Sequence, residues 1–232
     1  MRNIEIFKQY VLEQYPKEAC GYVEDEVFYA VENVASDPVN FFLFPEEISF
    51  TIADKDVTII HSHTMETWEN DPRTPSLEDM IAQKNTGHTF GIVHTDGTIV
   101  SDILYFGPPQ ETSLIGRKYL HNVNDCFTIA RDFYWQFFNI DIGINPRKAD
   151  WEEWNPNYIL QNYIGMGFSE VSELQFGDAL LFCISSTIPN HIGIYLDNDR
   201  FVHHLYRRTS EEDSLQKWKR QLVKILRHKD VR

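Results

Sequence analysis

The first sixty residues switch between two kinds of hydrophobic spacing. Apolar side chains recur at helical intervals over residues 3–14, which predicts an amphipathic helix that ends before Pro16. Residues 18–23 and 27–34 are rich in β-branched and aromatic side chains and flank the acidic turn at 24–26. This pattern predicts two strands joined by that turn.

The next segment predicts two more strands and a helix. Residues 40–44 form a short apolar run, and residues 57–60 form a β-branched run that ends directly at His61. A Thr-Pro pair follows a polar loop and predicts a helix start, with Thr74 as the N-cap and Pro75 in the first helical position.

A hairpin and a break in the pattern end the first half of the chain. Residues 89–93 and 98–106 predict two strands around an Asp-Gly turn. The sequence Gly-Pro-Pro-Gln at 107–110 interrupts the pattern, so we expect a domain boundary there. The predicted domains cover residues 1–107 and 113–232.

The second half reads as one helix followed by short strands. Apolar residues at helical spacing predict a helix over 126–138, and residues 141–176 look irregular. The later elements that we expect are a strand at 179–184, a hairpin formed by 191–196 and 200–204, a helix at 211–221 and a strand at 222–226. Mixed elements of this kind predict an α+β or α/β protein with two domains.

Composition and charge exclude some classes of protein. With 42% hydrophobic and 14% aromatic residues among 232, the chain can bury proper cores and does not resemble a disordered protein. Its net charge of −14 argues against a nucleic-acid partner. No stretch has the length and hydropathy of a membrane span, and the N-terminus lacks a signal-peptide core. We therefore expect synthesis in a cytoplasm, and any action outside the cell would need another route of release.

The three cysteines are better explained as reduced thiols than as disulfide partners. Their number is odd, and a chain of this length does not depend on disulfides for its stability. Cys20 and Cys183 lie within apolar strands and are expected to fill the core. Cys126 differs because it stands where a helix should begin.

A first candidate site has the residue types of a zinc centre. His61 and His63 are two apart at a strand end, so their side chains point the same way and can reach one ion. Asp79 can supply a third ligand, and Glu18 can act as the general base toward a bound water. Ser76 can donate a hydrogen bond to a developing oxyanion. The alternative is a polar strand end with two solvated histidines.

These residues resemble the JAMM motif of the JAB/MPN-type metallopeptidases. The resemblance covers about residues 1–106 and implies a mixed sheet with flanking helices, one zinc ion and hydrolysis of amide or isopeptide bonds. Two features depart from the motif. Thr64 replaces the usual proline, and the stretch between His63 and Ser76 is about five residues longer than usual.

A second candidate site has the residue types of a cysteine peptidase. A helix N-terminus lowers the pKa of a thiol, and Asp125 can cap the helix that Cys126 begins. His191 on the following hairpin can serve as the base, and His203 on the paired strand can orient it. A loop around Tyr119 can close the pocket. The alternative is a buried structural cysteine with hydrogen-bonded histidines.

This second pattern resembles the NlpC-type papain-like cysteine peptidases, which cut stem peptides of bacterial peptidoglycan. The resemblance covers about residues 113–230 and implies a helix that bears the cysteine and packs on an antiparallel sheet. It implies Cys126 as nucleophile, His191 as base, His203 as orienting residue and Tyr119 as a pocket residue. Phe and Thr replace the small Ser-Gly pair that usually follows the cysteine, which would narrow access to the thiol.

The order of the two motifs resembles a family of tail tip assembly proteins of long-tailed phages. That resemblance implies other tail tip proteins and peptidoglycan peptides as partners. It also implies a protein made in the host cytoplasm and then carried in the virion tail tip. Three interpretations stay open: a bifunctional peptidase, a structural component of the tail tip with vestigial sites, and a cellular hydrolase that remodels the wall.

Overall fold

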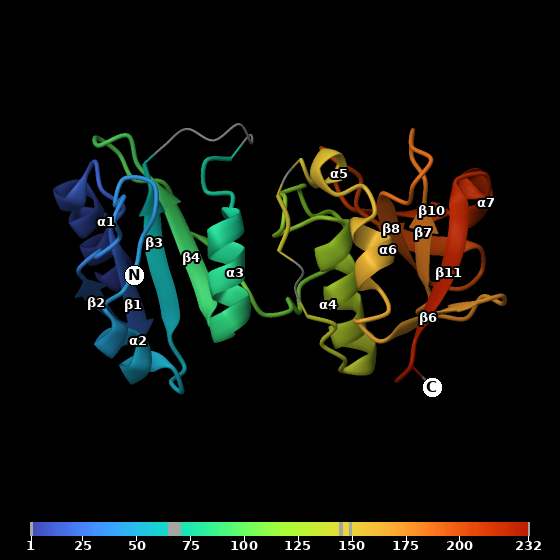
Figure 1. The fold of residues 1–232 in the computed structure, drawn as a ribbon, viewed down its shortest axis with the longest axis horizontal. Coiled ribbons are helices and arrows are strands. Elements are labelled where there is room, and N and C mark those ends of the chain that lie inside the picture. Colours follow the sequence, from blue (N-terminus) through green and yellow to red (C-terminus); the bar gives the residue numbers. More distant parts are fainter. Residues whose placement is uncertain (1, 65–70, 144–145, 149, 232) are drawn as a thin grey trace. The chain divides into compact units, whose positions relative to one another are not determined.

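The structure, a computed structural model, describes residues 2–64, 71–143, 146–148 and 150–231. They fold into two compact units, residues 1–108 and 109–232 (Figure 1). None of the helices in this described part has the length and apolar character needed to cross a membrane.

The first unit is built on a five-stranded mixed sheet with the strand order β2-β1-β3-β4-β5 (Figure 1). Strands β3 and β4 are parallel and are joined through helix α3, whereas the other neighbours are antiparallel. In chain order its elements are α1 (Arg2–Gln14), β1 (Cys20–Glu24), β2 (Val27–Val31), α2 (Glu46–Ile52), β3 (Thr58–His63), α3 (Leu77–Thr86), β4 (Thr89–His94) and β5 (Leu104–Phe106).

The core of this unit confirms the amphipathic first helix. Phe7 and Val11, four residues apart on α1, are both fully buried. They pack against Ala19, Ile60 and Val93 from the sheet. The helix therefore covers the sheet beside the strand that carries the paired histidines.

The predicted strand at 40–44 is wrong, although the segment is extended. It is held by one side chain rather than by a ladder: Asn33 Nδ2 donates to the carbonyl of Phe41, and Asn33 Oδ1 accepts from the N–H of Leu43. Helix α2 follows directly, and the sequence pattern did not predict it.

The predicted start of helix α3 at residues 74–75 is also wrong. Ser76 is the N-cap, and a reciprocal pair of hydrogen bonds with Asp79 forms a capping box. Thr74 instead donates its hydroxyl to the carbonyl of Asp71 in the preceding turn. The predicted hairpin is present, but its second strand is only β5, with Phe90 opposite Phe106.

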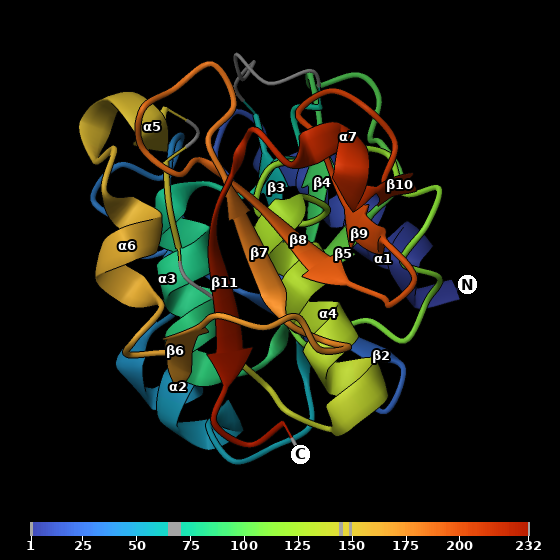
Figure 2. The ribbon, with the colours of Figure 1, turned by 90° about the vertical axis from the view of Figure 1, so that its right-hand side faces the viewer.

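The second unit has a six-stranded antiparallel sheet with the order β10-β9-β8-β7-β11-β6. Figure 2 looks onto this sheet, with β7, β8 and β9 side by side. In chain order its elements are α4 (Cys126–Phe138), α5 (Trp151–Trp154), α6 (Tyr158–Asn162), β6 (Phe168–Val171), β7 (Ala179–Phe182), β8 (His191–Tyr195), β9 (Arg200–His203), β10 (Glu211–Ser214), α7 (Leu215–Trp218) and β11 (Leu222–His228).

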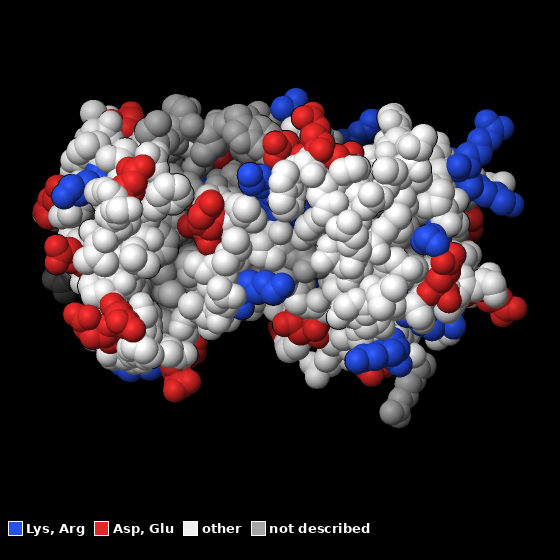
Figure 3. Space-filling model, viewed as in Figure 1, with Lys and Arg blue, Asp and Glu red and all other residues white. Residues whose placement is uncertain are grey.

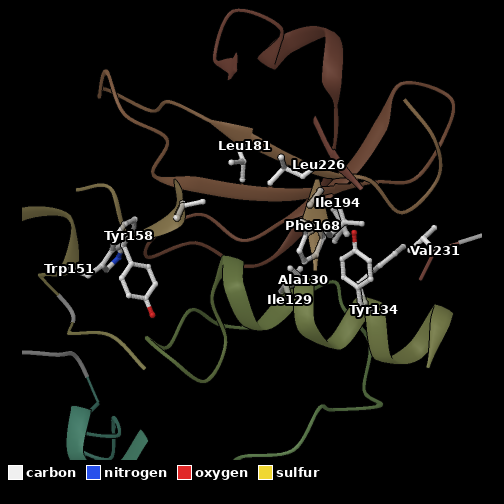
Figure 4. Packing of buried hydrophobic residues seen from close by; sticks show 14 residues of the cluster. Ile129, Ala130, Tyr134, Trp151, Tyr158, Phe168, Leu181, Ile194, Leu226 and Val231 are labelled. Atoms are coloured by element: carbon white, nitrogen blue, oxygen red, sulfur yellow. The ribbon is translucent and has the colours of Figure 1, made fainter. Parts of the chain in front are cut away.

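Helix α4 packs on one face of this sheet, as expected, and has the predicted bounds. Figure 4 shows Ile129, Ala130 and Tyr134 of α4 facing Ile194 and Leu226 of the sheet. All of these side chains are at most 4% exposed. This cluster holds the N-terminus of the helix, which begins with Cys126, at one end of the sheet.

The predicted helix at 211–221 is wrong in its first part. Residues Glu211–Ser214 form edge strand β10, which pairs with β9, and only Leu215–Trp218 are helical. The segment 141–176, expected to be irregular, contains α5, α6 and β6. On the face shown in Figure 3, acidic and basic side chains are interspersed over both units.

A matched pair of substitutions tests the core of the second unit. Ile194→Ala removes a fully buried side chain between α4 and the sheet and should lower the free energy of unfolding by about 2–5 kcal/mol. Ile164→Ala truncates a side chain that is 69% exposed and should change it by less than about 0.5 kcal/mol. Urea denaturation followed by circular dichroism measures both, and equal effects would contradict this packing.

Candidate functional site

Three side chains of the first unit converge on one point. His61 and His63 project from the end of β3, and Asp79 projects from the first turn of α3. Their facing atoms are almost equidistant: 3.2 Å between the two Nε2 atoms, 3.1 Å from His61 Nε2 to Asp79 Oδ1 and 3.2 Å from His63 Nε2 to Asp79 Oδ2. The structure therefore brings the three predicted ligands together.

This triangle has the dimensions of a tetrahedral metal site. Ligands about 2.0–2.1 Å from a zinc ion lie about 3.3 Å apart when they occupy corners of a tetrahedron. His63 Nδ1 lies 2.9 Å from the carbonyl oxygen of Pro72 and must donate to it, so the lone pair of its Nε2 faces the triangle. His61, His63 and Asp79 could thus hold a metal ion, with a fourth position left for water.

Asp79 is oriented by the cap of its own helix. Its Oδ2 accepts a hydrogen bond of 2.8 Å from the N–H of Ser76, while Ser76 Oγ accepts from the N–H of Asp79 at 3.0 Å. The Ser76 hydroxyl keeps its own proton available for donation. The capping box therefore fixes the ligand carboxylate and leaves the predicted oxyanion role of Ser76 as a prediction.

The serine between the two histidines positions Glu18. Ser62 faces the other side of β3, where its Oγ accepts from the N–H of Ala19 at 2.9 Å and its N–H donates to the carbonyl of Ala19 at 2.9 Å. Cys20 is opposite His61 in the antiparallel register, and Glu18 lies just before this strand, where the charges of His63 and Asp79 act on it. Glu18 is buried at the edge of the triangle.

Burial and charge set the protonation states in this site. Burial raises the pKa of Glu18 to about 8, although His63 opposes the shift. Burial would also raise the pKa of Asp79, but the two imidazoles hold it well below its usual value. Burial lowers the pKa of His61. For His63 burial is again the largest single effect, but the hydrogen bond to Asp79 and the charges of Asp79 and Glu18 together outweigh it and raise the pKa.

Two further residues shape this centre. Phe42 stacks on the His61 ring with centroids 4.3 Å apart, and the Nδ1 of that ring has no hydrogen-bond partner among the described residues. Thr64, the departure from the motif, donates to the carbonyl of Val39 at 3.1 Å and ties the chain after β3 to the segment before Phe42. Much of the longer stretch after His63, residues 65–70 with Trp68, lies outside the described residues.

In the second unit, Cys126 is the first residue of α4, as predicted. Asp125 is the N-cap, and its Oδ1 accepts from the N–H groups of Phe127 and Thr128. Thr128 Oγ1 in turn accepts from the N–H of Asp125 at 2.8 Å. The Cys126 sulfur accepts a backbone hydrogen bond from Ile192, so it lies beside the start of β8.

The two predicted histidines are in direct contact. His191 begins β8 and His203 ends β9, and the distance from His191 Nε2 to His203 Nδ1 is 2.9 Å. Gly193 lies opposite His203 in the register and leaves room for Phe201, which packs on the His203 ring. Because Nε2 of His191 is engaged by His203, Nδ1 is the nitrogen left to act on a thiol.

Both imidazoles are neutral in this environment. Burial lowers the pKa of His191 to about 3 and that of His203 to about 4. Burial raises the pKa of Cys126 to about 12, and the Asp125 carboxylate adds to the rise. The thiol is therefore protonated and both imidazoles are neutral, so any attack by this sulfur would require the thiol to lose its proton first.

Sequence reasoning missed the residues behind the histidine pair. Trp218 packs on His203 with ring centroids 5.1 Å apart, and its Nε1 donates to Asp213 at 2.9 Å. The Asp213 charge raises the pKa of His203, against the larger effect of burial. Asp213 lies in the segment for which we expected a helix, so the sequence carried no signal that it would act on His203.

Tyr119 lies at the same end of the unit. Its ring makes edge contacts with His204 and Tyr206, with centroids 5.5 and 5.0 Å apart. His204 directs Nε2 to the carbonyl of Arg208 at 3.0 Å. The role of Tyr119 as a pocket residue stays a prediction.

The bulky pair after the cysteine makes contacts within the core and the helix cap. Phe127 makes edge contacts with Trp151 and Tyr158 and packs against the main core cluster, while Thr128 completes the capping box. Whether this bulk narrows access to the Cys126 thiol stays a prediction. Both side chains support the helix.

Comparison with known proteins finds a family model that matches part of the chain within this unit. Residues 116–227 match the model of the NlpC/P60 family, a family of cysteine peptidases and hydrolases. The chain is 34% identical over 119 residues to tail tip assembly protein K of Escherichia phage lambda, and the match covers 50% of this chain and 59% of that protein. Tail tip assembly protein K of Escherichia phage N15 is 27% identical over 246 residues, which cover 100% of this chain and 96% of that protein.

Solved structures of the same family are more distant. The NlpC/P60 domain of the peptidoglycan hydrolase SagA is 19% identical, with a TM-score of 0.33. The match covers 49% of this chain and 89% of the SagA chain. An NlpC/P60 family protein from Bacillus cereus is 13% identical, with a TM-score of 0.35, and covers 96% of this chain and 67% of that one. The family model and the protein K relatives confirm the predicted resemblance: the chain resembles tail tip assembly protein K and carries an NlpC/P60 domain.

The buried neutral histidines predict acid sensitivity. His121 has its pKa lowered to about 4 by burial, and His191 to about 3, whereas an unfolded histidine titrates near pH 6.5. The unfolded state therefore binds more protons as the pH falls from about 6.5 toward 4, and stability falls with it. Each histidine contributes a slope of up to about 1.4 kcal/mol per pH unit.

Urea denaturation between pH 7.5 and 4.5 measures this slope. His121→Gln keeps a donor for the carbonyl of Arg147, which His121 Nε2 approaches at 3.2 Å, but cannot take up the proton. Its stability should depend less steeply on pH than that of the wild type. Parallel pH profiles for the two proteins would contradict the neutral buried state of His121.

Proposed function

Starting from the NlpC/P60 domain at residues 116–227, we propose that this chain is a phage tail tip assembly protein with two peptidase-type sites. The second unit is a thiol peptidase and the first is a zinc-dependent hydrolase of amide or isopeptide bonds. The observation that carries the proposal is the contact between His191 and His203, together with the backbone hydrogen bond that links Cys126 at the start of α4 to Ile192, the residue after His191. The likeness to protein K of phage N15 over the whole chain supports the tail tip role.

In the second unit, Cys126 is the nucleophile and His191 is the base. His191 takes the thiol proton at Nδ1 as the sulfur attacks a peptide carbonyl, and it returns the proton to the leaving amine. A water molecule then releases the acyl group from the sulfur. His203 Nδ1 holds His191 Nε2, which keeps the ring in one orientation throughout.

In the first unit, His61, His63 and Asp79 would hold a zinc ion, which supplies Lewis acidity and a water of lowered pKa. Ser76 donates a hydrogen bond from its hydroxyl to the substrate oxygen that gains negative charge. The close approach of the two Nε2 atoms to each other, and of each to one oxygen of the Asp79 carboxylate, supports this assignment.

The substrates we propose are stem peptides of host peptidoglycan or proteins of the tail. The resemblance to NlpC-type peptidases supports the first, and the likeness to tail tip assembly proteins supports the second. Other tail tip proteins are then the binding partners. The protein would be made in the host cytoplasm and carried in the virion tail tip.

One observation favours a second candidate function, a structural role with weak sites. The Cys126 thiol has its pKa raised to about 12 by burial, which opposes the thiolate that attacks best. In that case the chain would contribute to the tail tip by contacts alone. Activity measurements separate the two functions.

Metal analysis tests the first site. The purified chain should bind about one equivalent of zinc, and His61→Ala should lose it because two ligands cannot replace three. His88→Asn, which changes a buried histidine outside the triangle, should keep the metal. Equal zinc content in His61→Ala and the wild type would exclude this triangle as the zinc site.

Cleavage of muropeptides tests the second site. Cys126→Ala should lower the cleavage rate by at least about 1,000-fold, since it removes the nucleophile. A chelator or Glu18→Gln should leave that cleavage unchanged and should remove only a cut made by the zinc site. If the wild type cleaves no peptide, or Cys126→Ala cleaves as fast, the structural role is the one that stands.

A further inference from the structure

Arg147 is a buried cation at the N-terminus of helix α4. Its side chain is 4% exposed and forms an ion pair with Asp125, the residue that caps the helix. Its guanidinium carbon lies 3.9 Å from the centroid of the Phe127 ring. The side chain therefore contacts the residues on both sides of Cys126.

The backbone of Arg147 is attached to the same place. Its carbonyl accepts hydrogen bonds from His121 Nε2 at 3.2 Å and from Asn122 Nδ2 at 2.9 Å. Asn122 also donates its N–H to Asp125 Oδ2 at 2.7 Å. One residue thus joins the segment 146–148, the loop before the helix and the helix cap.

The charge balance around the thiol depends on this pair. Asp125 is 1% exposed, and its carboxylate next to Cys126 opposes a second negative charge on the sulfur. The other ionisable groups at this end, His121, His191, His204 and Tyr158, have pKa values shifted toward their neutral forms, mainly by burial. Among the described groups that act on Cys126, Asp125 and Arg147 are the two that carry charge.

We propose that Arg147 is a positioning residue of the cysteine site, which holds the first turn of α4 in place and compensates the Asp125 charge that opposes formation of the Cys126 thiolate. This inference rests on the proposed thiol peptidase. It also explains why an aromatic residue follows the cysteine: the Phe127 ring supports the guanidinium that neutralises the cap.

The rate of alkylation by iodoacetamide reports the thiolate fraction of Cys126, and peptide mass mapping separates it from the other two cysteines. We compare the full-length wild type with Arg147→Met, Asp125→Asn and the double variant between pH 7 and 9. Arg147→Met should react about tenfold more slowly at each pH, because one pKa unit is a tenfold change in thiolate. The double variant removes both charges and should return to within about threefold of the wild type.

Cys183, which is partly exposed and lies in the loop after β7, is the internal control and should react equally in all four proteins. A purely structural role would change stability in Arg147→Met but would leave the pH profile of Cys126 unchanged, and that result would overturn the proposal. If Arg147→Met does not fold, Asp125→Asn decides: Arg147 without its carboxylate should speed alkylation, and an unchanged rate overturns the proposal. Alkylation needs no cleavage, so an inactive peptidase with these shifts would remove the proposed function alone.

Discussion

A capping box at the start of a helix is the interaction on which both candidate sites depend. In the first unit, the hydrogen bonds between Ser76 and Asp79 begin α3 and direct the Asp79 carboxylate toward the two histidines. In the second unit, the corresponding bonds between Asp125 and Thr128 begin α4 and place Cys126 at its first position. Each box satisfies N–H groups that a helix start leaves free, so the reactive side chain is held by the local backbone.

The two sites use burial in opposite ways. In the first, the imidazoles keep Asp79 ionised although it is buried, so the centre retains a negative charge that suits a cation. In the second, the thiol and both histidines are neutral, and the one buried carboxylate nearby is paired with Arg147. Because the thiol and the imidazoles are neutral, the site avoids the cost of a buried thiolate–imidazolium pair in addition to the Asp125–Arg147 pair.

Departures from the family motifs have structural explanations here. Thr64 anchors the chain after β3, the strand of His61 and His63, through its hydroxyl, which proline could not do. Phe127 turns into the core and carries the Arg147 guanidinium, while Thr128 supplies the second half of a capping box. These residues therefore stabilise the geometry that the motifs require.

Local pattern and motif spacing sufficed for the elements that carry the chemistry. The helix at 126–138, the strand that leads to His61 and the hairpin of β8 and β9 follow from hydrophobic periodicity, which depends on near neighbours. The same spacing predicted that His61 and His63 share a face and that the hairpin pairs His191 with His203, and both contacts are present. These features could be predicted because each depends on residues close together in the chain.

Tertiary structure alone decided the features that depend on distant partners. Asn33 holds an extended segment that otherwise looks like a strand, and residues Glu211–Ser214 become a strand because β9 offers an edge to pair with. Arg147 lies in a segment without periodicity, and its partner Asp125 is 22 positions away. The free energy of such contacts comes from burial and pairing across the fold, which no local window of sequence contains.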